Sequence, residues 1–268
     1  MNYYEFCEIL NRHIFENEKR ELITKIAEYP ERFIGLFRPT KPNVKVLQFL
    51  LQSHEIKMGD ALEEVIEKII ESCGFRILNK DIINNDNEML KLDQYFTDGR
   101  KYYFIEQKVR DDHDSTKKRG QIKNFEAKLE VLYRRHGSDI VGIIYFIDPN
   151  LSKNKAYYSN ELEKLKEKYK LELYLLYGEE LFTFLGHSYY WSSILSWLRS
   201  WKENLPDLPE VNFDKNPEES FQEIKDLDLE IWRKVVKNDE LWDEGLLKVI
   251  FPTGETLIKV VNHLKKTR

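Results

Sequence analysis

Apolar residues recur at helical spacing through the first fifty positions of the chain. The segments YYEFCEIL, ELITKIAEY and VKVLQFLLQS all show this period, and the proline-containing stretch RPTKP at 38–42 interrupts it. Another apolar stripe at 60–73 indicates a helix that ends at Gly74. The pattern therefore predicts a helical N-terminal segment, followed by a separate helix that opens with GDALE at 59–63.

The pattern then changes to that of strands. FRIL at 75–78 is strand-like, and residues 89–96 and 101–109 are rich in aromatic and branched side chains. The last two segments are joined through Asp98-Gly99, a dipeptide typical of tight hairpin turns. We therefore expect an antiparallel hairpin in the centre of the chain.

Helical and strand patterns alternate beyond the hairpin. Residues 119–135 and 158–169 show helical spacing, whereas 140–147 and 171–177 have the continuous apolar character of buried strands. This order predicts an α/β fold with a mixed central β-sheet flanked by helices, its later strands being joined by right-handed crossovers.

The C-terminal part has a different composition. Three prolines and several acids between 206 and 217 indicate a linker or long loop, which separates a tryptophan-rich segment from a last helical part. The helical spacing of Trp191, Trp197 and Trp201 is typical of a packing stripe rather than a base-stacking surface. We expect a helical N-terminal segment at 1–55, a catalytic core at 56–205, and a linker with a small, mostly helical C-terminal region at 206–268.

Composition excludes several classes of protein. Two cysteines without CxxC spacing provide neither a disulfide framework nor a zinc site, which favours a reducing cytoplasm. The longest apolar run, IVGIIYFI at 140–147, is too short to cross a membrane, and the N-terminus has no signal-peptide pattern. The phosphate-binding motifs GxxxxGK[ST] and GxGxxG are absent, so we expect a soluble protein without a nucleotide cofactor.

Charge points to a local rather than a general affinity for nucleic acid. A net charge of −5 argues against a protein that coats DNA by bulk attraction. Residues 101–135, however, contain ten Lys or Arg against six Asp or Glu. Positive charge is therefore concentrated around the second half of the hairpin and the helix that follows it.

Candidate catalytic residues lie on the hairpin. Asp93 is expected on its first strand, and Glu106-Gln107-Lys108 on its second. Glu106 and Lys108 share one face, because side chains two positions apart in a strand point the same way, and Asp93 can reach the same end of the sheet. Two carboxylates and an ammonium suit phosphodiester hydrolysis, in which acids hold Mg²⁺ and the lysine acts on a water.

Two neighbouring features extend this site. The helix before the hairpin can deliver Glu63 to the same place, although Glu63 and its neighbour Glu64 are equally compatible with a solvent-facing acidic pair. A polar segment rich in charged residues follows the second strand directly and mixes phosphate donors with groups that read base edges. The candidate DNA-binding residues in this segment are Arg110, Asp112, His113, Ser115, Lys117, Lys118, Arg119, Gln121 and Asn124.

These residues together resemble a known superfamily. The order is GDALE, GF, Leu92-Asp93, IEQK at 105–108, a basic loop, a Gln-bearing helix and IVGIIYF. Over residues 56 to about 177 it resembles the PD-(D/E)xK nucleases, and most of all the type II restriction endonucleases. Leu92 stands where these enzymes usually have proline, and Gln107 where they usually have an apolar residue.

The resemblance implies a role for each residue. Asp93 and Glu106 would bind Mg²⁺ with the backbone carbonyl of Gln107, Lys108 would assist the attacking water, and Glu63 would complete the site. Mn²⁺ is expected to substitute for Mg²⁺. The implied substrate is double-stranded DNA, cut at a short specific sequence to leave 5′-phosphate ends. Because such sites are commonly two-fold symmetric, a homodimer is also implied.

Other interpretations remain open at this point. A repair or recombination nuclease of the same fold would cut by structure rather than sequence, and a DNA-binding module would have lost catalysis. An isolated D…ExK pattern also arises by chance in a chain with 33% charged residues. An HNH-like site from His113, Asn124 and His136 is a further alternative, but the segment between these residues reads as a helix.

Overall fold

The computed structural model describes residues 1–84, 86–112 and 114–266. Within them the chain forms two compact units. The first contains Met1–Leu10 and Gly59–Glu203, and the second contains Asn11–Met58 and the residues from Asn204 onward. Each unit is therefore assembled from two separate stretches of sequence.

The first unit contains a β-sheet and helices that alternate along the chain. Among the described residues, five strands form one sheet in the order β1-β4-β5-β6-β7. Strands β4 and β5 are antiparallel, whereas β5, β6 and β7 are parallel, so a helix connects each of the later pairs. This confirms the predicted mixed sheet. The elements are β1 (Arg76–Ile77), β4 (Gln94–Thr97), β5 (Tyr102–Lys108), α4 (Ser115–His136), β6 (Ile140–Phe146), α5 (Lys155–Tyr169), β7 (Glu172–Tyr177), α6 (Glu179–Phe184) and α7 (Tyr189–Glu203).

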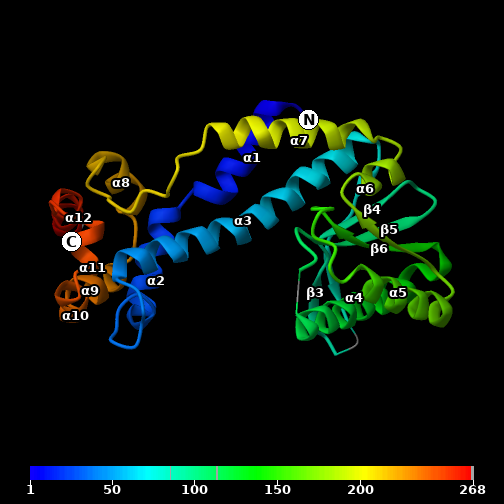
Figure 1. Cartoon of the computed structure of the whole chain (residues 1–268), viewed down its shortest axis with the longest axis horizontal. Coiled ribbons are helices and arrows are strands. Elements are labelled where there is room, and N and C mark those ends of the chain that lie inside the picture. Colours follow the sequence, from blue (N-terminus) through cyan, green and yellow to red (C-terminus); the bar gives the residue numbers. More distant parts are fainter. Residues whose placement is uncertain (85, 113, 267–268) are drawn as a thin grey trace. The chain divides into compact units, whose positions relative to one another are not determined.

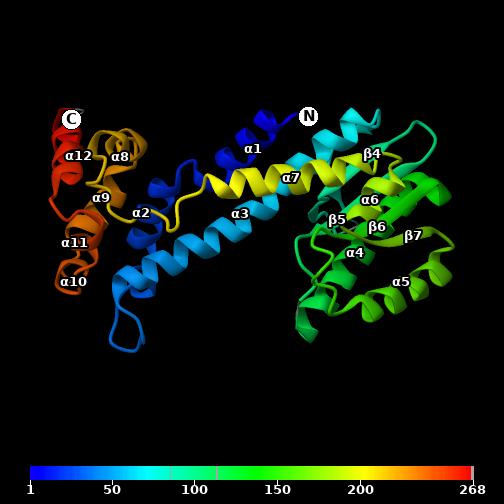
Figure 2. The same cartoon turned by 45° about the horizontal axis from the view of Figure 1, so that its top comes forward.

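Helices α4 and α5 lie on the same face of this sheet, as Figure 1 and Figure 2 show from two directions. All seven residues of β6 are buried. In its centre, a Cβ added to Gly142 would come within 2.8 Å of side-chain atoms of Leu173 and Phe104. Glycine therefore lets the rings of Phe104 and Phe125 stack over the strand, with centroids 4.9 Å apart. The core between α4 and the sheet depends on this close approach.

The strand predicted at 89–96 is wrong in one respect, because the chain changes sheets within it. Residues Met89–Lys91 form β3, which pairs with β2 (Asp81–Ile83) in a separate two-stranded sheet. Leu92 is fully buried, and its backbone N–H donates to the carbonyl of Lys80. Only from Gln94 does the chain pair with β5. Asp93 consequently lies just before β4 rather than within a continuous strand.

The helix predicted to begin with GDALE is also longer than expected. Helix α3 (Pro42–Ser72) is continuous, so Gly59 and Asp60 are interior positions. A mid-helix glycine costs only about 1 kcal/mol relative to alanine, and the nearby Met58, Ala61 and Leu62 are good helix formers. Val109 lies 3.8 Å from the place of a Cβ on Gly59, in ordinary van der Waals contact. The helix begins instead at Pro42, and proline is well suited to the first turn of a helix.

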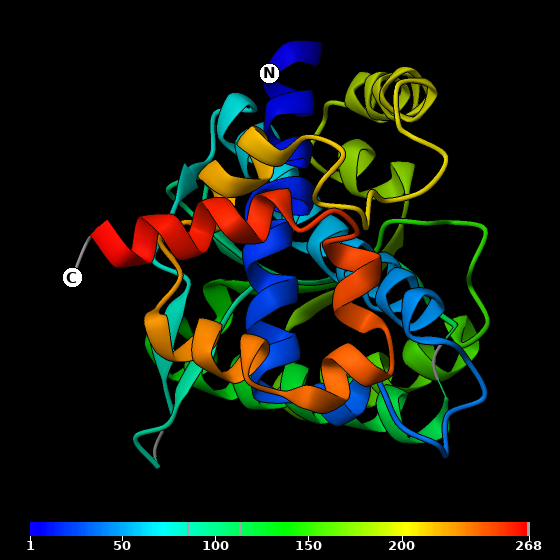
Figure 3. The ribbon, with the colours of Figure 1, turned by 90° about the vertical axis from the view of Figure 1, so that its left-hand side faces the viewer.

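The second unit is helical. Its buried core joins Leu22 and Ile26 to Trp232, Leu247 and Val260, which are far apart in the sequence. Helix α2 packs against α8 and α9, and α12 packs against α8 (Figure 3). No helix among the described residues is long and apolar enough to cross a membrane. The helices not yet named are α1 (Tyr3–Phe15), α2 (Glu18–Glu28), α8 (Pro217–Ile224), α9 (Leu229–Val236), α10 (Asp239–Asp243), α11 (Leu246–Ile250) and α12 (Glu255–Lys266).

Candidate active site

Asp93 is fixed at the point where the chain enters β4. The register pairs Gln94 with Ile105, which places Asp93 beside the end of β5 that carries Glu106. Its Oδ2 atom accepts hydrogen bonds from the backbone N–H of Gln107 (2.7 Å) and from Nζ of Lys108 (3.0 Å). The carboxylate is therefore held against β5 although it lies outside the strand.

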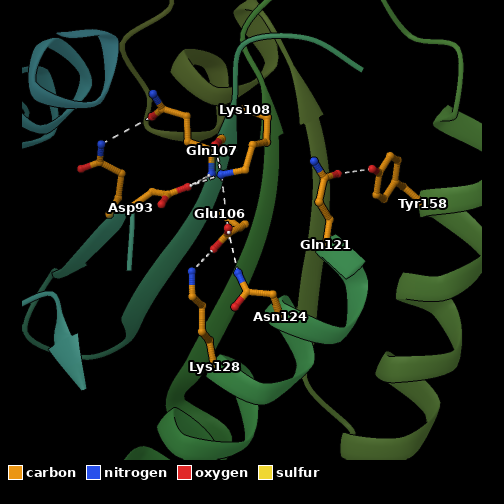
Figure 4. A network of polar contacts seen from close by, with 9 residues as sticks. Asp93, Glu106, Gln107, Lys108, Gln121, Asn124, Lys128 and Tyr158 are labelled. Carbon is orange, nitrogen blue, oxygen red and sulfur yellow. Dashed lines mark hydrogen bonds and ion pairs between the residues drawn. The ribbon is translucent and has the colours of Figure 1, made fainter. Parts of the chain in front are cut away.

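Lys108 joins the two predicted acids. Its ammonium lies 3.0 Å from Oδ2 of Asp93 and 3.3 Å from Oε1 of Glu106, and it donates to the carbonyl of Gln107 at 2.6 Å (Figure 4). Burial acts to lower the pKa of Lys108, but the negative charges of Glu106 and Asp93 outweigh it and the pKa is raised. Three oxygen atoms from three residues thus converge on one positive charge.

Glu106 is also held from helix α4, by contacts that the sequence analysis missed. Asn124 donates to Oε1 at 3.2 Å, and Nζ of Lys128 lies 2.5 Å from Oε2. Lys128 is a candidate site residue that we did not predict. One signal could have found it: Lys128 falls on the apolar stripe of α4, three residues after Phe125 and four before Leu132, where a charge requires a buried partner.

Glu63 reaches the site from α3. Nε2 of Gln94 donates to the backbone carbonyl of Glu63 at 2.7 Å, and it lies 3.4 Å from the side-chain oxygen of Gln107. Burial raises the pKa of Glu63 to about 7, and the negative charge of Asp93 adds to this effect. Glu64, in contrast, lies 3.9 Å from Lys68 on the same helix. Glu63 is thus coupled electrostatically to Asp93.

This raised pKa predicts a pH-dependent stability. The folded protein holds a proton on Glu63 up to about pH 7, whereas the unfolded chain releases it near its ordinary value of 4.5. Stability from this group is thus complete below pH 4.5 and declines as the pH rises through 7. In EDTA, Glu63→Gln should raise the unfolding free energy at pH 8 by about 1 to 2 kcal/mol, after allowance for solvent screening.

Thermal unfolding followed by circular dichroism at pH 4.5 and pH 8 measures this difference. Glu71→Gln, at an exposed glutamate on the same helix, is the matched control and should show no gain at pH 8. An equal effect of Glu63→Gln at both pH values would contradict the assignment of a raised pKa to Glu63.

The oxygen atoms at this site suit a hard divalent ion. Among the described residues, no group of three or more His, Cys, Asp or Glu side chains is placed to hold a metal. Two carboxylates and a main-chain carbonyl nevertheless surround the ammonium of Lys108, which shows that this point favours a cation. Carboxylate and carbonyl oxygens are ligands that Mg²⁺ accepts. Asp93, Glu106 and the carbonyl of Gln107 therefore fit the ion that the sequence pattern implies.

A comparison with known protein families decides the identity. The family profile described as Type II restriction endonuclease, HinfI, matches this chain at residues 2–87 and 75–202. The chain belongs to this family. No curated protein matches the sequence in a separate comparison. The HinfI family match spans Glu63, Asp93, Glu106 and Lys108, and it supports a restriction-endonuclease-like PD-(D/E)xK nuclease. Type II enzymes act on DNA, so the surface beside this site is the place to seek DNA contacts.

In this HinfI-family chain, the predicted DNA-binding segment leads from β5 into helix α4. Asp114 caps the helix by accepting hydrogen bonds from the N–H groups of Thr116 and Lys117, both at 2.9 Å. The candidates with exposed side chains are Arg110, Asp112, Ser115, Lys117, Arg119 and Asn124. His113 lies outside the described residues.

Lys118 and Gln121 have contacts within the protein, as Asn124 has with Glu106. Nζ of Lys118 donates to Oδ1 of Asn154 at 3.1 Å and lies 4.6 Å from the ring centroid of Tyr157. Gln121 accepts a hydrogen bond from the hydroxyl of Tyr158 (Figure 4). Lys117 and Arg119 are consequently better placed than Lys118 for contact with DNA phosphates.

This difference predicts which charges control the salt dependence of binding. Lys117→Ala and Arg119→Ala should each weaken binding to all DNA sequences alike and reduce the log–log salt slope by about one unit per lost phosphate contact. Lys118→Ala, the matched control on the same turn, should change the slope less because its ammonium is bound to Asn154. Fluorescence anisotropy in EDTA from 50 to 200 mM salt measures the slopes. Unchanged slopes for Lys117→Ala and Arg119→Ala would show that these side chains do not contact DNA phosphates.

The HNH-like alternative is not supported by the positions of its residues. His136 stacks on Tyr102, with ring centroids 3.6 Å apart, and forms a hydrogen bond with the hydroxyl of Tyr95. Burial lowers the pKa of His136. Asn124, twelve residues earlier on the same helix, contacts Glu106 instead, and the helical rise separates the two by about 18 Å. These two residues do not converge on a common site.

Proposed function

We propose that this chain is a site-specific endonuclease that hydrolyses both strands of DNA at a short sequence. The reaction depends on Mg²⁺ and leaves 5′-phosphate and 3′-hydroxyl ends. The observation that carries the proposal is the convergence of Asp93, Glu106 and the Gln107 carbonyl on Nζ of Lys108, in a chain of the HinfI family. Intact acids and an intact lysine argue against a DNA-binding module that has lost catalysis.

Each side chain then has a chemical task. Asp93 and Glu106 provide the carboxylate oxygens for the ion, and the Gln107 carbonyl supplies a third oxygen. When bound, Mg²⁺ supplies positive charge that stabilises the phosphate in the transition state. Lys108 orients the attacking water and offsets the negative charge that develops on the phosphate. Glu63 interacts electrostatically with Asp93 and is available to accept a proton, because its pKa of about 7 is close to neutral pH.

Sequence recognition is assigned to the segment 110–124, which leaves the catalytic strand and enters α4. We further propose a homodimer, because a two-fold symmetric site is met by two identical subunits and each subunit then cuts one strand. Mn²⁺ is expected to replace Mg²⁺, since both ions accept oxygen ligands.

Plasmid cleavage tests this function. Purified protein with Mg²⁺ or Mn²⁺ should convert a plasmid into a fixed set of fragments, and the same reaction in EDTA should leave it intact. Sequencing of the ends then gives the recognition site and the cut position. Robust cutting in EDTA would refute the metal-dependent mechanism. Fragments that depend on branches or flaps rather than sequence would identify a repair or recombination nuclease.

A further inference from the structure

Lys128 is a buried lysine inside the candidate active site. It is only 3% exposed and lies on the apolar side of α4 with Phe125, Leu129 and Leu132. Burial of an ammonium is strongly unfavourable unless an opposite charge meets it. That charge is Glu106, which is itself only 4% exposed. The residue pair is therefore buried as a unit, with one partner on the helix and the other on the catalytic strand.

The two oxygens of Glu106 have different surroundings. Oε2 is 2.5 Å from Nζ of Lys128, whereas Oε1 lies near Nδ2 of Asn124 and Nζ of Lys108, at 3.2 and 3.3 Å (Figure 4). Lys108 also contacts Asp93, so Oε1 is the oxygen on the side of the other carboxylate. Rotation of the Glu106 carboxylate would break the contact with Lys128. The carboxylate is thus held in one orientation by the helix.

We propose that Lys128 is a positioning residue that fixes Oε2 of Glu106, so that Oε1 is presented to the divalent ion, and that its charge also weakens binding of this ion. The proposal rests on the proposed function, because it assigns Glu106 to the ion. Its second part follows from electrostatics, since an ammonium and a divalent ion on the same carboxylate repel each other. Lys128 then has opposite effects on ion affinity and on turnover.

A role in packing alone predicts something different. If Lys128 only stabilised the core, its loss would loosen the centre and would lower ion affinity and cleavage together. A fixed cation predicts opposite changes, because removal of the charge relieves the repulsion while Glu106 loses its fixed orientation. Ion binding without DNA therefore separates the two interpretations.

The experiment compares the full-length wild-type chain with Lys128→Met and Lys128→Gln. Lys128→Met keeps the length and apolar stem of the side chain, and Lys128→Gln keeps a hydrogen-bond donor for Glu106 if the methionine variant does not fold. Lys164→Met, an exposed position on α5 outside the site and the segment 110–124, is the matched control for loss of one charge. Mn²⁺ alone is titrated and free Mn²⁺ is counted by electron paramagnetic resonance. Plasmid cleavage is measured separately at saturating Mg²⁺.

We expect Lys128→Met and Lys128→Gln to bind Mn²⁺ about tenfold more tightly than the wild type, as removal of a nearby like charge predicts. Cleavage at saturating Mg²⁺ should fall by about 10²-fold in Lys128→Met, the scale for loss of one preorganised group, and by less in Lys128→Gln, which keeps a hydrogen-bond donor for Glu106. Lys164→Met should match the wild type in both measurements. Unchanged or weaker Mn²⁺ binding in the folded variants would overturn the proposal, and so would unchanged cleavage. A wild-type chain that cuts no DNA would refute the proposed function, while the Mn²⁺ titration would still decide whether Lys128 opposes the ion.

Discussion

Asp93→Ala should abolish DNA cleavage, with a loss of about 10³-fold or more, because it removes one of the two carboxylates that we propose hold the ion. DNA binding in EDTA should be retained or become tighter, since a negative charge near the phosphate is lost. Asp93 also accepts a hydrogen bond from the buried backbone of Gln107, so the alanine variant should be about 1 to 3 kcal/mol less stable. Asp93→Asn keeps an acceptor for this N–H and should lose cleavage with less effect on stability.

Plasmid cleavage in Mg²⁺, gel-shift affinity in EDTA and thermal unfolding together separate these effects. Asp81→Ala changes an exposed aspartate of the first unit and should leave all three measurements close to those of the wild type. Substantial cleavage by folded Asp93→Asn would remove Asp93 from the catalytic assignment.

Lys108→Ala should reduce turnover by about 10²-fold or more while leaving specific DNA binding largely intact. The reason is geometric: its ammonium lies between Asp93 and Glu106, and no other cationic side chain among the described residues contacts both. Binding should be preserved because contact with DNA is assigned to the segment 110–124.

Gel shifts with Ca²⁺ in place of Mg²⁺ and single-turnover cleavage measure the two quantities. Lys91→Ala, an exposed lysine on β3, is the control for loss of one positive charge. If Lys108→Ala cuts at the wild-type rate, the proposed role of Lys108 is wrong. Equal losses of binding and turnover would assign Lys108 to DNA binding rather than to the reaction.

The centre of the fold was predictable because its signals are local. A continuous apolar run predicted β6, and the alternation of side chains in a strand placed Glu106 and Lys108 on one face of β5. The turn at Asp98-Gly99 correctly joined β4 to β5. These features depend on residues only a few positions apart, and the residue types alone determine them.

The remaining features depend on contacts between distant residues. Nothing near Leu92 in the sequence indicates that the chain leaves one sheet there and joins another, because the deciding hydrogen bond goes to Lys80. Helix α3 continues through Gly59, which the sequence pattern alone places at the start of a helix. The contact of Lys128 with Glu106 joins residues on different elements, 22 positions apart. Patterns of apolar residues cannot show which buried charges meet.

The discontinuous second unit has a consequence for synthesis of the protein. The residues of the first unit end at Glu203, so the nuclease unit is complete once that residue has left the ribosome. Leu22 and Ile26, in contrast, are buried together with Trp232 and Val260, which are translated after the first unit. At about 5 to 20 residues per second, ribosomes need roughly 3 to 13 seconds for the final segment. Until this segment has been translated, apolar side chains of 11–58 lack part of their core, and we expect chaperones to bind the nascent chain there.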